Sequence, residues 1–332
     1  MALLLYLPTD AFSDKRNDPD LAADYLELTA FFSPDNQALS QAVTKALEEA
    51  LEENYTTVEE ELEEREAAVA SAISRISQRL KFLGEAYPFE VDDTGDVVTF
   101  IGSDSISVGQ AAYLVSLVLS HLNSVSPVMS GTAVYPTDDE IRKLRNYFQY
   151  FATVGLAAEI GGPAWSFGHP RPDGTGFIEK LSEIWMELRD GCVNRDSSAP
   201  ENPKDDQVDV FAWRKQQDDL PGFLLAAAQV ATGANWKSKS VKSQVAGVFA
   251  SRWFNPQPVT TLVAYHIIPF ARPDNMFRDD VLVLGNILHR LRLPFRVMEA
   301  EDLVRNGVAI ETFEKLPHIV TWLQDYEHRG MV

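Results

Sequence analysis

The sequence predicts an α+β or α/β protein in two parts, a mainly helical part over residues 1–160 and a mixed sheet flanked by helices over residues 161–332. Three observations support this division. Apolar residues recur at helical spacings before residue 160, short apolar runs bounded by Pro and Gly follow it, and the charge balance changes between the parts. With 332 residues, 45% of them hydrophobic, the chain can bury two cores.

The negative charge is concentrated in the first part. The whole chain has a formal net charge of −20, from 29 Lys and Arg against 49 Asp and Glu. Residues 201–332 contain 15 basic and 16 acidic residues, so nearly all of the excess lies before residue 201. Residues 226–296 contain nine basic and three acidic residues. We therefore expect a basic surface in the second part, able to meet a polyanion.

The single cysteine, Cys192, excludes an internal disulfide framework and a cysteine-rich zinc site, and it indicates a reducing, cytoplasmic compartment. The apolar run Met1–Pro8 lacks a basic leader and is far shorter than the roughly 20 residues of a membrane span. We interpret this run as a buried strand and expect no membrane contact.

The first part is predicted to be helical almost throughout. The acidic run from Glu48 to Glu66 is interpreted as a solvated helix face rather than a surface for a partner. His121 falls on an apolar helix face and is interpreted as a core residue rather than a ligand. The predicted elements are helices over 19–32, 36–83 (a long helix or a helical hairpin), 108–123 and 138–156, and a short hairpin near 91–100.

The second part is predicted to begin after Gly161-Gly162-Pro163, which ends the last of these helices near residue 160. The G-T-G sequence at 174–176 has no preceding strand and no Walker lysine, so it predicts a loop that leads into a helix starting near Phe177. Glu179 and Glu183 lie off the apolar stripe of that helix. Their spacing alone does not make either one a ligand.

Two apolar runs form a predicted hairpin, and each contains one polar residue. V-D-V-F-A-W begins at residue 208, F-L-L-A-A-A-Q-V-A begins at residue 223, and a polar segment ending in Pro221-Gly222 separates them. If the loop is centred on residue 218, Asp209 lies opposite Ala227 and Gln229 is its diagonal neighbour, roughly 7–8 Å away at Cα. The two polar side chains are therefore expected to converge.

A helix is predicted from about Asn235 to Phe254, after a turn at Gly233. Lys237 lies four residues before Val241, within about 40° of the apolar stripe of this helix. Because an inward lysine seldom lacks a partner, we expect Lys237 to turn back toward the sheet.

The remaining chain predicts strands over 259–268 and 281–284, followed by G-N-I-L-H-R-L-R-L-P-F-R-V with three arginines. His266 and His289 are not spaced with carboxylates as zinc ligands are. Structural and nucleic-acid-facing roles stay open for both histidines.

A helix with a glutamate, a V-D-V strand, a strand ending in Q-x-A and a displaced lysine together resemble the PD-(D/E)XK nuclease superfamily in a Gln-containing variant. The resemblance covers roughly residues 165–300. The segments Q-V-A-T-G-A-N-W-K-S-K and G-N-I-L-H-R-L-R-L resemble bacterial proteins associated with anti-phage defence. This implies a restriction-endonuclease-like fold and hydrolysis of phosphodiester bonds, with DNA as the expected substrate and Mg²⁺ (or Mn²⁺) as the cofactor.

Carried onto this chain, the resemblance makes Asp209 the metal-binding aspartate and gives Gln229 the position of the family's second acid. Ala231 stands where the family's lysine usually lies, so the resemblance passes that role to Lys237. Glu179 matches the helix-borne acid, with Glu183 as its substitute. The expected catalytic residues are Asp209, Gln229, Lys237 and Glu179, the expected metal ligands are Asp209, Gln229 and Glu179, and the expected nucleic-acid contacts are Lys239, Lys242, Arg290 and Arg292.

Two other classes of function stay open. The second part could be a nuclease fold that has lost catalysis and binds nucleic acid or a partner protein, or the chain could be purely structural. Because so acidic a protein is poorly suited to scanning bare DNA, an activating partner such as an ATPase or helicase is expected.

Overall fold

The computed structural model describes residues 18–50, 58–122, 137–272 and 274–329, so the strand expected over Met1–Pro8 lies outside the described residues. The chain divides into two compact units. The first contains Met1–Arg145 and Pro317–Val332, and the second contains Asn146–Leu316. Among the described residues, none of the helices combines the length and the apolar character that a membrane crossing requires.

The first unit combines helices with a small antiparallel sheet of order β1-β3-β2. The expected hairpin is present, because Phe89 pairs with Phe100 and Val91 with Val98. The expected helical tract 36–83 is interrupted, since strand β1 precedes α3 and pairs Gln37 with Thr99. The elements are α2 (Pro19–Phe32), β1 (Gln37–Leu39), α3 (Gln41–Ala50), α4 (Val58–Leu83), the 3₁₀ helix η1 (Gly84–Ala86), β2 (Phe89–Val91), β3 (Val97–Phe100), α5 (Val108–Ser120) and α12 (Leu316–Arg329).

The expected boundary near residue 160 falls inside the second unit. Helix α6 (Asp138–Ile160) begins in the first unit and continues in the second, because the division falls between Arg145 and Asn146. The C-terminal helix α12 belongs mainly to the first unit, where the ring centroids of Tyr326 and Phe32 are 5.7 Å apart. Gly161 does end α6, with a φ of +76°.

The second unit is built on a five-stranded mixed sheet of order β4-β5-β6-β7-β8. The first three strands are antiparallel neighbours, whereas β6, β7 and β8 run parallel. A mixed sheet flanked by helices agrees with the predicted class. The elements are β4 (Ala164–Ser166), α7 (Phe177–Leu188), β5 (Val210–Arg214), β6 (Leu224–Val230), η2 (Trp236–Ser238), α8 (Val241–Gly247), α9 (Phe249–Trp253), β7 (Leu262–Ile267), α10 (Asp274–Leu284), β8 (Asn286–Leu288), α11 (Leu293–Arg305) and η3 (Phe313–Lys315).

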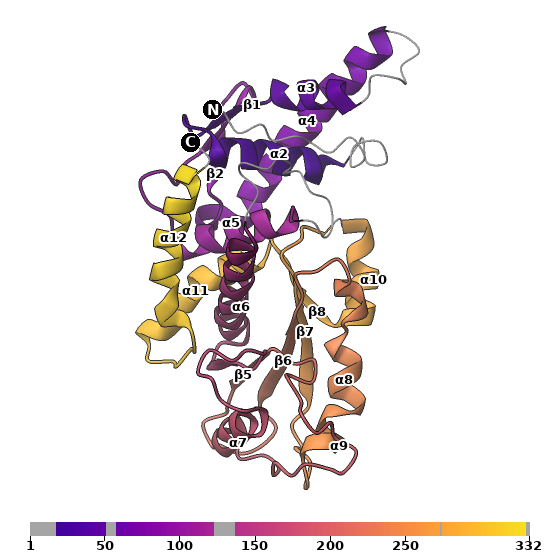
Figure 1. Ribbon diagram of the computed structural model, residues 1–332, viewed down its shortest axis with the longest axis vertical. Helices are drawn as coiled ribbons and strands as arrows, with labels where there is room; N and C mark the ends of the chain where they lie inside the picture. The colour runs from indigo at the N-terminus through magenta and orange to yellow at the C-terminus, as the bar shows by residue number, and fades with distance from the viewer. Residues whose placement is uncertain (1–17, 51–57, 123–136, 273, 330–332) are drawn as a thin grey trace. The chain divides into compact units, whose positions relative to one another are not determined.

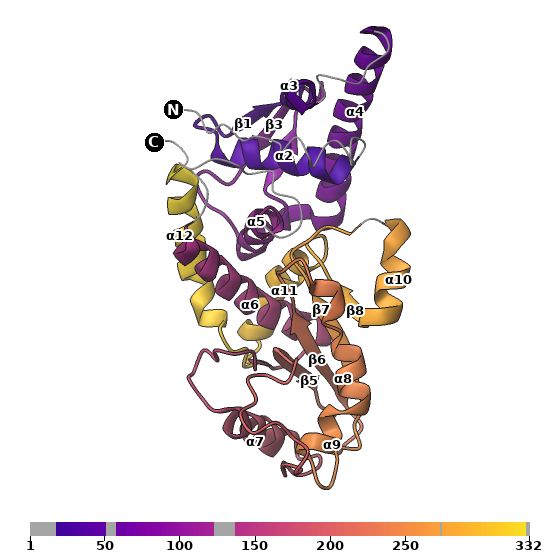
Figure 2. The same ribbon diagram turned by 45° about the vertical axis from the view of Figure 1, so that its right-hand side comes forward.

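Helices cover both faces of this sheet (Figures 1 and 2). Helices α7, α8 and α9 pack on one face, where the Phe211 ring lies 5.2 Å from Trp185 and 5.9 Å from Phe249 between centroids. On the other face, the Tyr265 hydroxyl of β7 bonds Glu159 of α6 at 3.3 Å. Arg296 of α11 pairs with the same Glu159 at 2.7 Å. The candidate site lies at one end of the strands in this helix-covered sheet.

Two predicted elements of the second unit are wrong. The apolar run 281–284 is the last turn of α10 rather than a strand, since four apolar residues cannot distinguish the two periods. Gly285, at a φ of +92°, ends that helix and leads into β8. The single helix expected over 235–254 is divided into η2, α8 and α9, because Trp236 leaves the helical stripe to pack near Phe270, 6.1 Å away between ring centroids.

Candidate functional site

The Asp209 and Gln229 side chains meet at one end of the hairpin, as predicted. Gln229 Nε2 donates a hydrogen bond to Asp209 Oδ2, and the backbone N–H of Val230 donates to the same oxygen at 2.8 Å. Both side chains are buried, each with 7% of its surface exposed. The convergence that the sequence predicted is therefore confirmed.

The pairing in the hairpin is shifted by two residues from the prediction. Val210 pairs with Ala228 and Phe211 with Ala227, which centres the loop on residue 219 rather than 218. Asp209 lies just outside this register, because strand β5 begins at Val210 and the N–H of Asp209 donates to the carbonyl of Ala228 at 2.7 Å. The error arose because the polar loop extends through Phe223, the first residue of the second apolar run.

The backbone of Asp209 is held from the neighbouring strand and from α6. Its carbonyl accepts hydrogen bonds from the N–H groups of Phe167 at 2.6 Å and Gly168 at 2.9 Å. Gln149 Nε2 of α6 donates to the same carbonyl at 3.0 Å. A Cβ at Gly168 would lie 2.6 Å from Asp209 Oδ1, so a glycine is needed here for the carboxylate to fit. Neither Gln149 nor Gly168 was identified from the sequence.

The Asp209 carboxyl is a strongly perturbed acid. Burial, followed by the negative charge of Asp205, raises its pKa to about 7. The hydrogen bond from Val230, the positive charge of Lys239 and the hydrogen bond from Gln229 each lower the pKa without cancelling the effect of burial. A carboxyl group with this pKa changes its charge near neutral pH, which is typical of functional sites.

The lysine that acts on Asp209 is Lys239, whereas Lys237 was expected. Lys237 has 54% of its side chain exposed, and its Nζ lies 3.8 Å from Asp280 Oδ1. Lys237 belongs to the 3₁₀ turn η2. It was expected to turn toward the sheet because it was placed near the apolar stripe of a helix, and that helix does not include it. Lys239 is half-buried, and within the described part of the chain its ammonium makes no ion pair.

Glu179 does not join Asp209 and Gln229. It is exposed, and its Oε2 accepts a hydrogen bond from the N–H of Gly176 at 3.2 Å, so it stabilises the first turn of its own helix. Its proposed substitute, Glu183, is half-exposed and lies 3.7 Å from Lys180. Helix α7 instead buries Lys180, whose Nζ bonds Asp173 at 2.7 Å and Glu311 at 3.0 Å.

Cationic segments follow the parallel strands β6, β7 and β8, whose carboxyl ends share one edge of the sheet. Arg272 follows β7, and its guanidinium bonds Asp280 at 2.6 Å and stacks 5.0 Å above Trp236. Ligands of open α/β sheets bind outside the carboxyl ends of such strands. We call the surface formed by Lys237, Lys239, Lys242, Arg272 and Arg292 the basic edge.

Three of the four expected nucleic-acid contacts are accessible. Lys242 is exposed and donates to the carbonyl of Leu282 at 2.8 Å, and Arg292 is exposed and lies 4.4 Å above the ring of Phe277. Arg290 is fully buried, with 0% of its surface exposed, so it cannot meet a phosphate on the surface. Arg290 was chosen from sequence because alternating arginines after a strand cannot be assigned to a face without the register.

His266, whose role the sequence left open, lies on strand β7. It is the register partner of Gln229 on the parallel strand β7. Burial lowers its pKa to about 4, the Trp236 backbone and Asp280 act in the opposite direction, and Lys239 adds to the lowering. The signal that could have identified it is the one used for Asp209 and Gln229, a polar residue within an apolar strand.

The residues present fit a hard divalent ion only in part. The described residues contain no group of three or more His, Cys, Asp or Glu side chains that could hold a metal. Asp209 supplies one carboxylate, and the Gln229 amide, turned about its last bond, would present its oxygen beside it. Mg²⁺ often uses one or two carboxylates and takes its other ligands from water and substrate phosphate. Asp209 and Gln229 meet that minimum.

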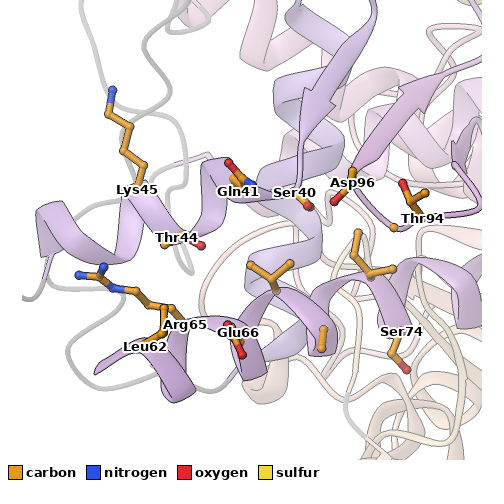
Figure 3. Close-up of a pocket in the computed structure, with 14 residues that line it drawn as sticks. Ser40, Gln41, Thr44, Lys45, Leu62, Arg65, Glu66, Ser74, Thr94 and Asp96 are labelled. Atoms are coloured by element: carbon orange, nitrogen blue, oxygen red, sulfur yellow. The ribbon is translucent and has the colours of Figure 1, made fainter. Parts of the chain in front are cut away.

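The first unit contains a pocket of about 970 Å³ between α3, α4 and the turn that joins β2 to β3 (Figure 3). Val69 and Ile73 of α4 form part of its apolar wall, with hydroxyl and charged side chains around them. Figure 3 shows Lys45 directed away from the labelled side chains of α4. The polar groups of this pocket do not converge as those around Asp209 do.

Comparison with known proteins gives no match of any kind: no family model, no curated protein and no solved structure matches this chain.

Proposed function

We propose that the second unit hydrolyses phosphodiester bonds in a nucleic acid, with DNA as the first substrate to test and Mg²⁺ or Mn²⁺ as the cofactor. The observation that carries this proposal is the convergence of Asp209 and Gln229 beside the basic edge, with the charge of Lys239 acting on Asp209. A buried acid next to a cationic surface is suited to a polyanionic substrate.

The order of elements also supports the proposal. Strands β4, β5 and β6 form an antiparallel meander, and helices α8 and α9 then lead to β7, which is parallel to β6. The restriction-endonuclease-like fold implied by the resemblance has a mainly four-stranded mixed sheet with flanking helices. We therefore propose this fold for the second unit, with β8 as an additional strand.

In this proposal, Asp209 and Gln229 hold the divalent ion and Lys239 takes the role first given to Lys237. A bound divalent ion lowers the pKa of a coordinated water and withdraws charge from a phosphoryl oxygen. Lys239 binds the scissile phosphate and stabilises the negative charge that develops on it. The exposed cations Lys242 and Arg292 hold the nucleic-acid backbone on either side.

Cleavage assays on Asp209→Ala test the proposal. We expect plasmid, linear and single-stranded DNA to be cut by the wild-type chain in Mg²⁺ or Mn²⁺ and left intact in EDTA, and we expect Asp209→Ala to cut none of them. Lys239→Ala should lose about 10²-fold in cleavage rate, because a charge that stabilises the transition state is removed. Full activity in Asp209→Ala would exclude the site.

Lys237→Ala is the matched control for Lys239→Ala. Both changes remove one lysine from the same short segment, but Lys237 is exposed and pairs with Asp280. We expect Lys237→Ala to retain cleavage within about threefold of wild type. A larger loss from Lys237→Ala than from Lys239→Ala would restore the assignment first made from the sequence.

A second candidate function is a nucleic-acid-binding module without catalysis. The observation in its favour is Ala231, which is 1% exposed and packs in the small core cluster with Trp236, at the position where the resemblance expects a lysine. This module would bind DNA with an affinity that falls steeply with salt, and it would cut none of the substrates at any metal concentration.

A protein partner completes the proposal. Because the chain carries a net charge of −20, we propose that an ATPase or helicase of an anti-phage defence system delivers the nucleic acid to the basic edge. Gel filtration and specific-activity measurements with and without such a partner test this. A lone monomer with full specific activity would contradict it.

A further inference from the structure

Lys180 is a buried lysine whose two carboxylate partners lie on different segments of the chain. Helix α7 carries it, and 3% of its surface is exposed. Its Nζ donates to Asp173 Oδ2 at 2.7 Å, in the loop before α7, and to Glu311 Oε1 at 3.0 Å, in the segment after α11. Lysines are almost never fully buried unless they are paired. The two ion pairs therefore join α7, the loop before it and the segment after α11.

The ion pair between Lys180 and Asp173 is strong enough to overcome its burial. Burial on its own would lower the pKa of Lys180, but the carboxylates of Asp173 and Glu311 raise that pKa above its usual value. Burial likewise opposes the ionisation of Asp173, but the hydrogen bonds from Lys180 and Thr175 lower its pKa to about 2. Both members of this pair are therefore charged at neutral pH.

Glu311 occupies the outer edge of strand β4. Its N–H donates to the carbonyl of Ala164 at 3.0 Å, and its Oε2 accepts the N–H of Ser166 at 2.7 Å. Because β4 has only three residues and lies at the edge of the sheet, its outward backbone groups need partners of this kind. Lys180 holds the other oxygen of the same carboxylate, and its Nζ lies 4.4 Å from the ring centroid of Trp165. Lys180 therefore contacts β4 directly and also through Glu311.

The inner edge of β4 leads to the candidate site. The two residues after the strand, Phe167 and Gly168, donate their N–H groups to the carbonyl of Asp209 at 2.6 Å and 2.9 Å. Gly168 also lies against the carboxylate, because a Cβ at this position would be 2.6 Å from Asp209 Oδ1. The backbone at Phe167 and Gly168 therefore sets where Asp209 lies.

We propose that Lys180 is a positioning residue of the ion site. The segment 166–173 is tied to Lys180 at both ends, through Glu311 at its first residue and through Asp173 at its last, and residues between these ends contact Asp209. This inference rests on the proposed function, because it concerns the placement of the same aspartate. Lys180 acts through the backbone, without contacting the ion or the nucleic acid.

Lys215 provides a matched control. It follows the far end of strand β5, whereas Asp209 immediately precedes the near end. Its Nζ lies 3.1 Å from Asp219 Oδ1, in the loop of the hairpin. Lys215→Met therefore removes a lysine and its ion pair next to the same strand and leaves the segment 166–173 with all its contacts.

Amide hydrogen exchange of the full chain, followed by nuclear magnetic resonance in EDTA, tests the link without any cleavage. Exchange reports the local opening of a hydrogen bond, so Lys180→Met should speed exchange at Phe167 and Gly168 by about tenfold or more. Ala231, whose N–H bonds strand β7 at 2.9 Å, is the reference amide and should keep its rate. Lys215→Met should leave all three rates unchanged. Unchanged rates at Phe167 and Gly168 in Lys180→Met, or equal acceleration at all three amides, overturn the inference.

Cleavage kinetics test whether this link matters for the reaction. Lys180→Met should lower kcat by about tenfold and keep KM within about twofold, because a misplaced catalytic group slows the chemical step while the nucleic-acid contacts remain. Lys180→Arg keeps the charge and should recover most of kcat. Asp173→Asn keeps the shape of the side chain and removes one of the two ion pairs, so it should give a smaller effect of the same kind and serves if Lys180→Met does not fold.

The two measurements separate the inference from the proposed function. A Lys180→Met protein with faster exchange at Phe167 and Gly168 but wild-type kcat overturns the positioning role and leaves the nuclease proposal intact. A wild-type chain that cuts no substrate overturns the proposed function, and the exchange rates then decide on their own whether Lys180 positions Asp209.

Discussion

Each of the two units buries a cluster of ionisable side chains, and the clusters differ in how completely their polar atoms are paired. In the first unit, Arg79 is 0% exposed and its Nη1 lies 2.6 Å from Glu27 Oε1 and 2.6 Å from Asp24 Oδ1. The hydroxyls of Tyr87 and Tyr113 donate to the Glu27 carboxylate at 2.5 Å and 2.6 Å. The guanidinium thus faces three carboxylates, since its Nη2 also lies 2.7 Å from Asp20 Oδ1, and the Glu27 carboxylate also accepts from both tyrosines.

The same cluster accounts for His121, whose Nε2 lies 2.7 Å from Asp24 Oδ2 at 3% exposure. His121 is thus a buried histidine with a partner, in agreement with its interpretation as a core residue. Burial on its own would lower the pKa of Arg79, but Glu27, Tyr113, Asp24 and Asp20 hold it well above its usual value.

In the second unit, burial raises the pKa of Asp209 to about 7 and lowers the pKa of His266 to about 4. In the first cluster, both Nη atoms of Arg79 and the Glu27 carboxylate have close partners, although Arg79 Nε has no hydrogen bond within the described residues. In the second cluster, the neighbours of Asp209 do not offset the effect of its burial on its pKa. Perturbed groups of this kind are candidates for binding and catalysis. Burial of charge alone therefore does not indicate function, whereas the pairing of the buried atoms does.

The largest expected effect is that of Arg79→Met, which removes the central cation of the first cluster. Removing this cation leaves Glu27 and Asp24 buried without their central partner, and breaking a buried ion pair costs about 3–5 kcal/mol. We expect urea unfolding of the full chain to report a loss of this size. Arg75→Met is the control, because Arg75 is 20% exposed and lies 3.4 Å from Asp20. The control should cost at most about 1 kcal/mol, and equal losses would contradict the comparison.

Asp209→Asn should have the opposite effect on stability. The raised pKa means that the folded state binds the Asp209 proton more tightly than the unfolded chain does, so this carboxyl lowers stability progressively from about pH 4 to about pH 7. A shift of this size corresponds to at most about 4 kcal/mol. In EDTA at pH 8, Asp209→Asn should therefore be more stable than wild type by a few kcal/mol.

The comparison between pH 5 and pH 8 isolates Asp209. His266 has a lowered pKa, so it raises stability as pH increases through about 4 to 6.5, but it does so in both proteins. The stability difference between Asp209→Asn and wild type should consequently shrink as pH falls from 8 to 5. A difference that does not depend on pH would mean that Asp209 is not perturbed as described.

Gln229→Glu should sharpen the contrast by adding a second negative charge to the second cluster. Two adjacent carboxylates repel each other in the metal-free protein, and a divalent ion relieves that repulsion. We expect Mg²⁺ affinity to rise about tenfold, equivalent to about 1.4 kcal/mol, as measured by isothermal titration calorimetry. Gln229→Ala should bind Mg²⁺ more weakly than wild type. Unchanged affinity in both variants would remove Gln229 from the ion site.

The sequence predicted the hairpin and its two polar residues, because each lies as an exception in an apolar run and Pro221-Gly222 marks the turn between them. The lysine could not be predicted in the same way. The choice between Lys237 and Lys239 depended on a continuous helix from Asn235, and a 3₁₀ turn at Trp236 rotates both lysines relative to that expectation.

Pairings between strands that are distant along the chain could not be predicted from the sequence either. Gln229 and His266 are register partners on the parallel strands β6 and β7, which helices α8 and α9 separate along the chain. No local sequence pattern encodes that register. Gly168 follows the same logic, since its contact with Asp209 depends on the pairing of β4 with β5. Local chemistry was predictable, whereas long-range register was not.

The smallest expected effect is that of Glu179→Ala, which tests a residue that the resemblance assigned to the site and the structure assigns to helix α7. Its carboxylate accepts the Gly176 N–H at 3.2 Å and lies in the first turn, where a negative charge stabilises a helix by about 0.5 kcal/mol. We expect thermal unfolding to report a loss of that order and the cleavage rate to remain within about twofold of wild type. A Glu179→Ala protein with wild-type stability and no cleavage would return Glu179 to the ion, and it would show that substrate or metal draws α7 toward Asp209. Glu179 is exposed and already has a local hydrogen-bond partner, as the paired residues of the first cluster do. Such an acid is a poor candidate for a metal ligand.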